Sequence, residues 1–337
     1  MTAFPRRWLG LAAVFIALAT PAAAQEPFYK GKVVSLIIGN NASGGFDTYG
    51  RLVARYLPRY LAGAPSMVVQ NMPGAGGVRA ANTLYTTSPK DGTTLGMIDQ
   101  AAYLNQLLGV AGLQADIPKF NWIGRMMSNS AVLIAWHTSP VKKAQDLVSP
   151  GMIVGATGSA SRLNWSAMNA LVGTKFRMIT GYEGAAASRI AMERGEIEGL
   201  SVPWSLLRAE QPEWLEKKFV TPILQTGIEK DPGVPDVPRM IDLAPNEDAR
   251  KTLEIFSAPS LIGRSMLAPP GVPAERVAEL RAAFWKAIND TDLRADAAKL
   301  QLDLDPLPGD KLQGMFAASY SDTLLARARE IAERVSR

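Results

Sequence analysis

Short apolar runs alternate along the chain with segments in which apolar residues recur every three or four positions. This alternation predicts strands and helices in turn. The run Val33–Ile38 is apolar, rich in β-branched residues and ended by Gly39, as expected of a strand buried on both faces. Over residues 49–57 the apolar side chains recur every three or four positions, which predicts one face of a helix. Further strands are predicted at 67–70 and 93–98 with a short helix between them, so this part of the chain is expected to be β-α-β-α-β.

The same pattern returns farther along the chain. Strands are predicted at 131–136, 151–155 and 176–180, and helical spacing follows the last two. A strand at 264–269 then precedes an amphipathic helix at 273–288. Alternating strands and helices of this kind give an α/β fold with parallel sheets. Because 337 residues are more than a single hydrophobic core usually organises, two α/β domains are expected.

Short segments of small residues between a predicted strand and helix are the candidate ligand-binding loops. Ligands of open parallel sheets bind beyond the carboxyl ends of the strands, and glycine lets main-chain N–H groups approach them. The partial positive charge at the start of the following helix favours an anion such as a carboxylate. Tight turns are the alternative use of these glycines, and the loops carry neither a dinucleotide nor a P-loop pattern. The candidate contacts are Ser43, Gly44, Gly45, Phe46, Asp47, Thr48, Gly158, Ser159, Ala160, Ser161, Tyr182, Gly184, Ala185 and Trp204.

The N-terminus has the three parts of a signal peptide. An arginine pair precedes the apolar stretch 8–19, and small residues at Ala22 and Ala24 match the pattern of a cleavage site. The apolar stretch is shorter than the roughly 20 residues that a bilayer-spanning helix needs. We therefore expect residues 1–24 to be a signal peptide, cleaved after Ala24, and the mature protein to be periplasmic.

Composition narrows the possible functions. Loss of Arg6 and Arg7 with the signal peptide lowers the formal charge from +5 to +3, and acidic and basic residues are interspersed, so we expect no nucleic-acid partner. The chain has no cysteine, a single histidine, His137, and no G-x-S-x-G elbow. A periplasmic hydrolase that depends on His137 is therefore the least favoured function. We expect no catalytic residue, no metal and no cofactor.

An ordered set of motifs carries a resemblance that extends over nearly all of the expected mature chain. The motifs are 32–47 with Arg51, 68–77, 89–93, 158–161, 182–184, 235–238 and 267–273. With this set the chain resembles the Bug-family periplasmic receptors of tripartite tricarboxylate transporters. The resemblance implies a type II periplasmic-binding-protein fold, in which two α/β lobes close around a carboxylated solute held largely by main-chain amides and water.

The resemblance also implies how the chain is divided and what it binds. Lobe one would combine residues 27–126 with 229–337, lobe two would span 127–228, and two crossover segments would join them as a hinge. A small organic acid would be the ligand, and the membrane permease subunits of a tripartite transporter would be the partner of a monomeric receptor. An orphan receptor that reports its ligand to a sensor partner is the alternative on the same fold.

Two acidic residues depart from the family pattern. Glu183 stands where the family usually carries a lysine, and Glu198 replaces an aspartate. Two like unit charges about 4 Å apart repel by about 4 kcal/mol at an effective dielectric near 20, so an inward-facing Glu183 would reject an anion. Either Glu183 faces solvent, or the ligand differs from that of the family.

Three of the residues near the expected site have two possible roles. Arg51 could bind a carboxylate through two hydrogen bonds, but with Arg55 and Arg59 it forms a row typical of a solvated helix face. Asp47 is predicted to cap the helix and to pair with Arg51. Trp204 could stack on an aromatic acid or pack between the domains.

Overall fold

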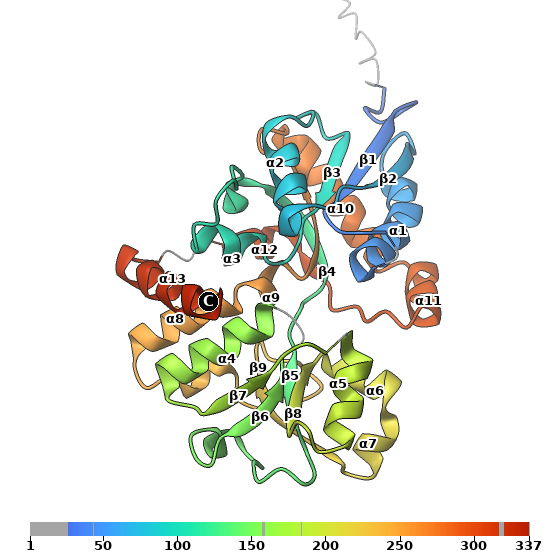
Figure 1. The fold of residues 1–337 in the computed structure, drawn as a ribbon. Helices are drawn as coiled ribbons and strands as arrows, with labels where there is room; N and C mark the ends of the chain where they lie inside the picture. Colours follow the sequence, from blue (N-terminus) through green and yellow to red (C-terminus); the bar gives the residue numbers. More distant parts are fainter. Residues whose placement is uncertain (1–25, 43, 157–158, 183, 317–319, 337) are drawn as a thin grey trace, which may run out of the picture.

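Two α/β lobes, one above the other in Figure 1, make up the protein. The computed structural model describes residues 26–336 apart from 43, 157–158, 183 and 317–319. One mixed sheet of six strands forms the centre of lobe one, and one of five strands forms the centre of lobe two. The predicted two-lobed α/β fold is confirmed.

The sheet of lobe one is covered by helices on both faces. Its strand order is β11-β4-β10-β3-β1-β2. The strands are β1 (Val33–Ile38), β2 (Ser66–Asn71), β3 (Thr94–Met97), β4 (Asn121–Met127), β10 (Arg264–Ala268) and β11 (Leu307–Pro308). The helices are α1 (Gly45–Tyr56), α2 (Val78–Thr86), α3 (Ala102–Leu107), α10 (Ala274–Ile288), α11 (Thr291–Lys299) and α12 (Gly309–Met315). Leu36 packs into the core beneath α1 and α10, while its neighbour Ile37 packs into the core beneath α2, as a strand buried on both faces requires.

The sheet of lobe two has the order β7-β6-β8-β5-β9. Its strands are β5 (Val132–Trp136), β6 (Met152–Gly155), β7 (Phe176–Ile179), β8 (Gly199–Val202) and β9 (Val220–Gln225). Its helices are α4 (Ser159–Val172), α5 (Gly184–Glu193), α6 (Trp204–Glu210) and α7 (Pro212–Glu216). Glu198, just before β8, accepts a hydrogen bond from the main-chain N–H of Ile153 at 2.6 Å. This acidic residue therefore supports the sheet.

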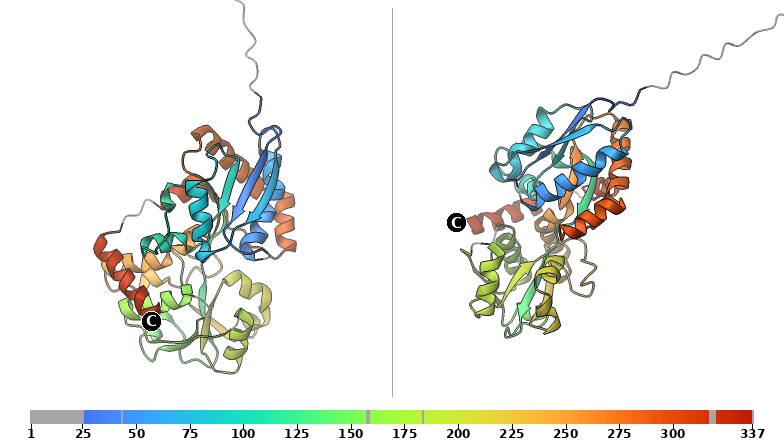
Figure 2. Two further views of the ribbon diagram at one scale, coloured as in Figure 1. Left: turned by 45° about the horizontal axis from the view of Figure 1, so that its top comes forward. Right: turned by 90° about the vertical axis from the view of Figure 1, so that its right-hand side faces the viewer.

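After β9 the chain stays with lobe two for one more helix and then returns to lobe one at β10. Its last helix packs on lobe two again. Helices α8 (Glu247–Ser257) and α13 (Asp322–Ser336) come from the segment 229–337 that the sequence assigns to lobe one, yet both pack against α4 (Figure 2). Leu253 and Phe256 of α8 and Ala328 of α13 share one buried core with Met168 of α4. The apolar faces of these helices therefore belong to lobe two, with the short helix α9 (Pro259–Ile262) leading back to β10.

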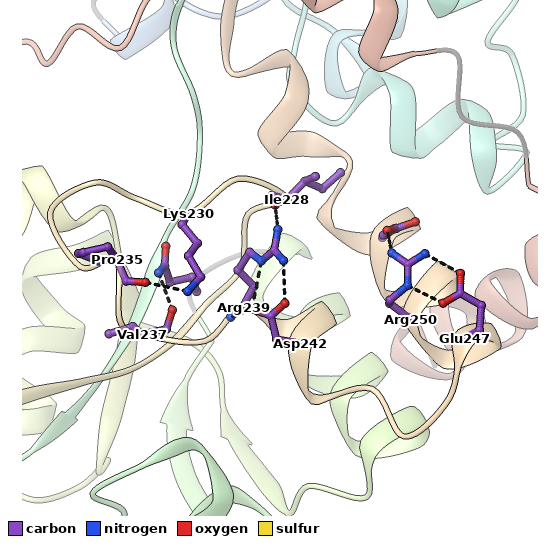
Figure 3. A network of polar contacts seen from close by, with 10 residues as sticks. Ile228, Lys230, Pro235, Val237, Arg239, Asp242, Glu247 and Arg250 are labelled. Carbon is purple, nitrogen blue, oxygen red and sulfur yellow. Dashed lines mark hydrogen bonds and ion pairs between the residues drawn. The ribbon is translucent and has the colours of Figure 1, made fainter.

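The loop that joins β9 to α8 is held by polar contacts that Figure 3 shows from close by. The guanidinium of Arg239 donates to the carbonyl of Ile228 at 2.6 Å and to the carboxylate of Asp242 at 2.7 Å. The ammonium group of Lys230 donates to the carbonyl of Pro235 at 2.7 Å. These bonds fold the loop back on itself.

A buried arginine of lobe one binds the loop that follows β9. Arg125 of β4 is 2% exposed, and its Nη2 donates to a carboxylate oxygen of Glu229 at 2.6 Å. This pair joins the sheet of lobe one to a loop that leaves the sheet of lobe two. None of the described helices is both long and apolar enough to span a bilayer.

Replacing Asp242 with asparagine should remove a pH-dependent part of the stability. The hydrogen bond from the Arg239 side chain holds the pKa of Asp242 below its ordinary value. A carboxyl group with a lowered folded pKa stabilises the fold above its unfolded pKa of about 3.9, and this stabilisation is lost as the pH falls through the folded pKa. We expect Asp242→Asn to lose about 1 kcal/mol of unfolding free energy at pH 7.

Urea unfolding at several pH values measures this loss. The difference between variant and wild type should shrink below about pH 4. A difference that stays constant at all pH values contradicts the assignment. The exposed Asp236 lies in the same loop between β9 and α8 and provides a control, because Asp236→Asn should leave stability unchanged at every pH.

Candidate functional site

The loop after β1 presents the start of α1 to the region between the lobes. Gly44 is the N-cap residue, and its carbonyl accepts hydrogen bonds from the N–H and the hydroxyl of Thr48 at 3.0 and 3.1 Å. Gly44 and Gly45 are exposed, whereas Phe46 and Asp47 are buried. The main chain at the helix start is therefore accessible, while the two following side chains anchor it.

Asp47 holds this loop in place. Its carboxylate accepts hydrogen bonds from Arg51 Nε at 2.9 Å and from Asn71 Nδ2 at 3.0 Å. Asn71 Nδ2 also donates to the carbonyl of Asn40, so three segments meet at one amide. The predicted pairing of Asp47 with Arg51 is confirmed. The N-cap position itself belongs to Gly44, and Asp47 lies in the first turn, where a negative charge is favourable.

The arginine row on α1 and on the 3-10 turn that follows it (Leu57–Tyr60) is a solvated face, as its spacing indicates. The side chains of Arg51, Arg55 and Arg59 are 52%, 56% and 53% exposed. Arg55 pairs with Asp296 at 3.3 Å, and Arg59 lies 3.9 Å from Asp290. These guanidinium groups therefore have carboxylate partners within the protein.

Arg264 is a candidate site residue that the sequence did not indicate. It begins β10, and its guanidinium lies 4.0 Å from the centre of the Phe46 ring. Its Nη1 donates to Gln100 Oε1 at 2.8 Å, while its buried Nε has no hydrogen-bond partner among the described residues. Burial lowers the pKa of this guanidinium, and the nearby Tyr49 and Asp99 oppose that change.

Asp99, the carboxylate that acts on Arg264 through space, is already hydrogen-bonded. One of its oxygens accepts from Asn40 Nδ2 at 2.8 Å, and the other accepts from the main-chain N–H of Ala101 at 2.8 Å. A charged arginine thus lies beside the start of α1, and the carboxylate of Asp99 already accepts hydrogen bonds from other groups. Only the antiparallel entry of β10 beside β3 brings Arg264 here, and sequence spacing carries no sign of that pairing.

Two neighbouring cavities lie at the junction of the lobes, and a third opens beside them within lobe two. The largest, of about 540 Å³, is lined by Gln100 and Leu104 from lobe one and by Ala160 and Leu163 from lobe two. A cavity of about 200 Å³ shares Gln100 and Ala160 with it and adds Ser161 and Thr226. Because both lobes line the same hollow, one small molecule can contact both.

The third cavity, of about 220 Å³, lies within lobe two. It shares Ser161 and Ser201 with the second cavity and is otherwise lined mostly by apolar side chains, among them Leu206 and Trp214. Ser161 at the start of α4 is thus common to the junction and to this apolar chamber. A solute with a polar end and an apolar end would find both surfaces here.

The structure brings together some of the predicted contacts and separates others. Ala160 and Ser161 line the cavities. The ring of Phe46 contacts Arg264, which donates a hydrogen bond to the cavity-lining Gln100. Trp204 is 8% exposed and packs in the core of lobe two, where Trp214 lines the third cavity in its place.

The other predicted contacts flank the cavities or cannot be placed. Tyr182 is half-buried against the core of lobe two, and Gly184 and Ala185 open α5. Ser43, Gly158 and Glu183 lie outside the described residues, as does the side chain of Ser159.

The described part of the chain contains no group of three or more His, Asp or Glu side chains placed to hold a metal ion. His137 is exposed and contacts the aromatic rings of Trp136 and Phe219. The largest cavity is lined by Arg329 and Glu333 together with mostly apolar side chains, and the second cavity adds several hydroxyl groups. The guanidinium of Arg264 lies behind Gln100. Hydroxyl and guanidinium groups can bind oxygen atoms of a solute by hydrogen bonds and charge.

Replacing Asp47 with alanine should loosen the glycine loop. The buried amide of Asn71 would lose an acceptor and Arg51 its carboxylate partner, so we expect a loss of about 1–3 kcal/mol in unfolding free energy. Arg51→Gln is the matched control, because an exposed ion pair contributes at most about 1 kcal/mol. Urea unfolding followed by tryptophan fluorescence measures both, and equal losses from the two variants would contradict this role of Asp47.

Comparison with known proteins places the chain in a family. Residues 50–331 match the family model described as the tripartite tricarboxylate transporter family receptor, TctC. The chain is 28% identical over 309 residues to the UPF0065 protein in gbd 5'region of Cupriavidus necator, with 87% of each chain covered. A UPF0065 protein of Bordetella bronchiseptica is 25% identical over 278 residues, covering 80% of this chain and 76% of the relative.

Solved structures share the fold. A TctC solute-binding protein from Polaromonas is 20% identical and superposes with a TM-score of 0.69, covering 91% of this chain and 99% of that one. MatC from Rhodopseudomonas palustris with bound malate has a TM-score of 0.54 at 20% identity, and an R. palustris protein with adipate has 0.55 at 18%. These two cover 89% and 90% of this chain, and 99% and 97% of their own. The chain therefore belongs to the TctC, or Bug, family of tripartite tricarboxylate transporter receptors, which are periplasmic solute-binding proteins and not enzymes.

Proposed function

We propose that this protein captures a small carboxylate in the periplasm, after removal of a signal peptide at Ala24, for uptake by a tripartite tricarboxylate transporter. The observation that carries the proposal is the hollow between the lobes, with Gln100 and Ala101 on one side and Ala160 and Ser161 on the other. Its cavities, of about 200 and 540 Å³, suit a molecule of the size of a small organic acid.

The charge of the site supports an anion. Both α1 and α4 begin at or near the junction, and each helix start carries a partial positive charge. Arg264 adds a full positive charge on the lobe-one side. Malate and adipate, the ligands of the two R. palustris relatives, are dicarboxylates that fit this chemistry.

In this proposal the main chain at Gly44 and Gly45 and the start of α4 at Ala160 and Ser161 bind the solute from opposite lobes. The segments that connect the lobes allow them to close. A ligand favours the closed form only to the extent that it binds the closed form more tightly than the open one. The receptor then acts as a monomer that delivers its solute to the permease subunits in the membrane.

A thermal-shift screen tests the proposal directly. The full mature protein is mixed with malate, adipate, citrate and benzoate, and each is compared with an uncharged amide of the same skeleton. A ligand present at about 100 times its Kd stabilises the folded state by about 2.7 kcal/mol, which raises the melting temperature measurably. We expect at least one acid to do so and its amide not to. If the uncharged compounds alone raise it, the carboxylate assignment is wrong.

A further inference from the structure

We propose that Arg264 binds a carboxylate of the solute directly, so that lobe one contributes a side-chain charge in addition to the main chain of its glycine loop. This inference rests on the proposed function and adds to it a residue that determines the specificity for acids.

One edge of the Arg264 guanidinium faces the first residue of α1. A Cβ atom added to Gly45 would lie 3.6 Å from Nη2 and 3.9 Å from Nε. The remaining nitrogen, Nη1, is used by Gln100 at 2.8 Å. An arginine binds a carboxylate through two parallel hydrogen bonds from one such edge. The edge formed by Nε and Nη2 is therefore the one directed at the proposed anion site, and the described residues give Nε no acceptor.

The Arg264 guanidinium contacts a neutral amide, a neutral ring and the start of a helix. It is beside the N-terminal end of α1, where the helix dipole is also positive. The Phe46 ring stabilises the cation through its face, but a neutral ring does not cancel the charge. Asp99 acts on Arg264 through space, and its hydrogen bonds go to Asn40 and Ala101. A carboxylate on the Gly45 side would give the guanidinium a direct ionic partner.

Gln100 links Arg264 to the cleft between the lobes. The same side chain that accepts from Arg264 Nη1 lines the two cavities at the junction. Gln100 therefore orients the guanidinium and borders the space that the solute would fill. Gly45 carries no side chain, so the first residue of α1 places only main chain against the edge formed by the buried Nε and Nη2. The chemical class of ligand is thus an organic acid with a carboxylate that reaches the first turn of α1.

The first experiment changes the charge of residue 264. Arg264→Met and Arg264→Lys are compared with wild type by isothermal titration with malate, adipate, citrate and benzoate, and with the uncharged amide of whichever acid binds most tightly. A charge-assisted pair contributes about tenfold to a hundredfold in affinity, so Arg264→Met should weaken binding of the acid by that factor. Arg264→Lys should restore part of it, because it keeps the charge but loses the two-bond geometry. Binding of the amide should be unaffected.

The second experiment leaves Arg264 in place and fills the space in front of it. Gly45→Ala adds a methyl group 3.6 Å from Nη2, an ordinary contact distance, so the protein should fold with an unchanged melting temperature. We expect it to weaken binding of the acid at least tenfold, because the methyl group occupies the position of the carboxylate. Gly314→Ala in α12 is the control, because a methyl group added there would meet nothing within 4 Å and Gly314 lines none of the three cavities. Its affinity for the acid should be kept.

The outcomes separate this inference from the proposed function. If wild type binds an acid and both Arg264→Met and Gly45→Ala lose the preference for the acid over its amide, the inference holds. If wild type binds an acid with Kd values that neither variant changes, the inference is overturned and the proposed function stands. If wild type binds none of the acids, both are overturned. Should Arg264→Met fail to fold, Gly45→Ala decides alone.

Discussion

The constraint on which this structure depends is the insertion of β10 between β3 and β4 after the chain has built lobe two. This antiparallel strand completes the sheet of lobe one and obliges the chain to pass between the lobes a second time. The buried guanidinium of Arg125 pairs with the half-exposed carboxylate of Glu229, which joins the sheet of lobe one to the loop after β9. The same insertion carries Arg264 to the start of α1, so one topological step creates both a connection between the lobes and the charged side of the candidate site.

Most of the elements could be predicted from the sequence, because local patterns determine them. The apolar run of β1, the helical spacing of α1 and the glycine turns before α1 and α4 are visible in the residues themselves. The pairing of Asp47 with Arg51 follows from their spacing of four on a helix. Apolar runs and helical spacing therefore sufficed for the fold class and for the positions of α1 and α4.

What could not be predicted arises from contacts distant in sequence. The periodicity of α8 and α13 shows that each has an apolar face, but not that both faces pack on α4 of the other lobe. Trp204 and Trp214 are both buried in the core of lobe two, and only the packing of α6 and α7 places the second beside a cavity. Arg264 looks like the polar start of a strand until its neighbours across the sheet are known.

The packing of α13 on lobe two means that the chain begins on one lobe and ends on the other. Residues 26–32 lead into β1 at the top of lobe one, whereas the last turns of α13 rest against α4 (Figure 1). The distance between the two ends therefore changes whenever the lobes move relative to each other. A pair of fluorophores attached just before β1 and after α13 would report lobe motion without any label in the cleft.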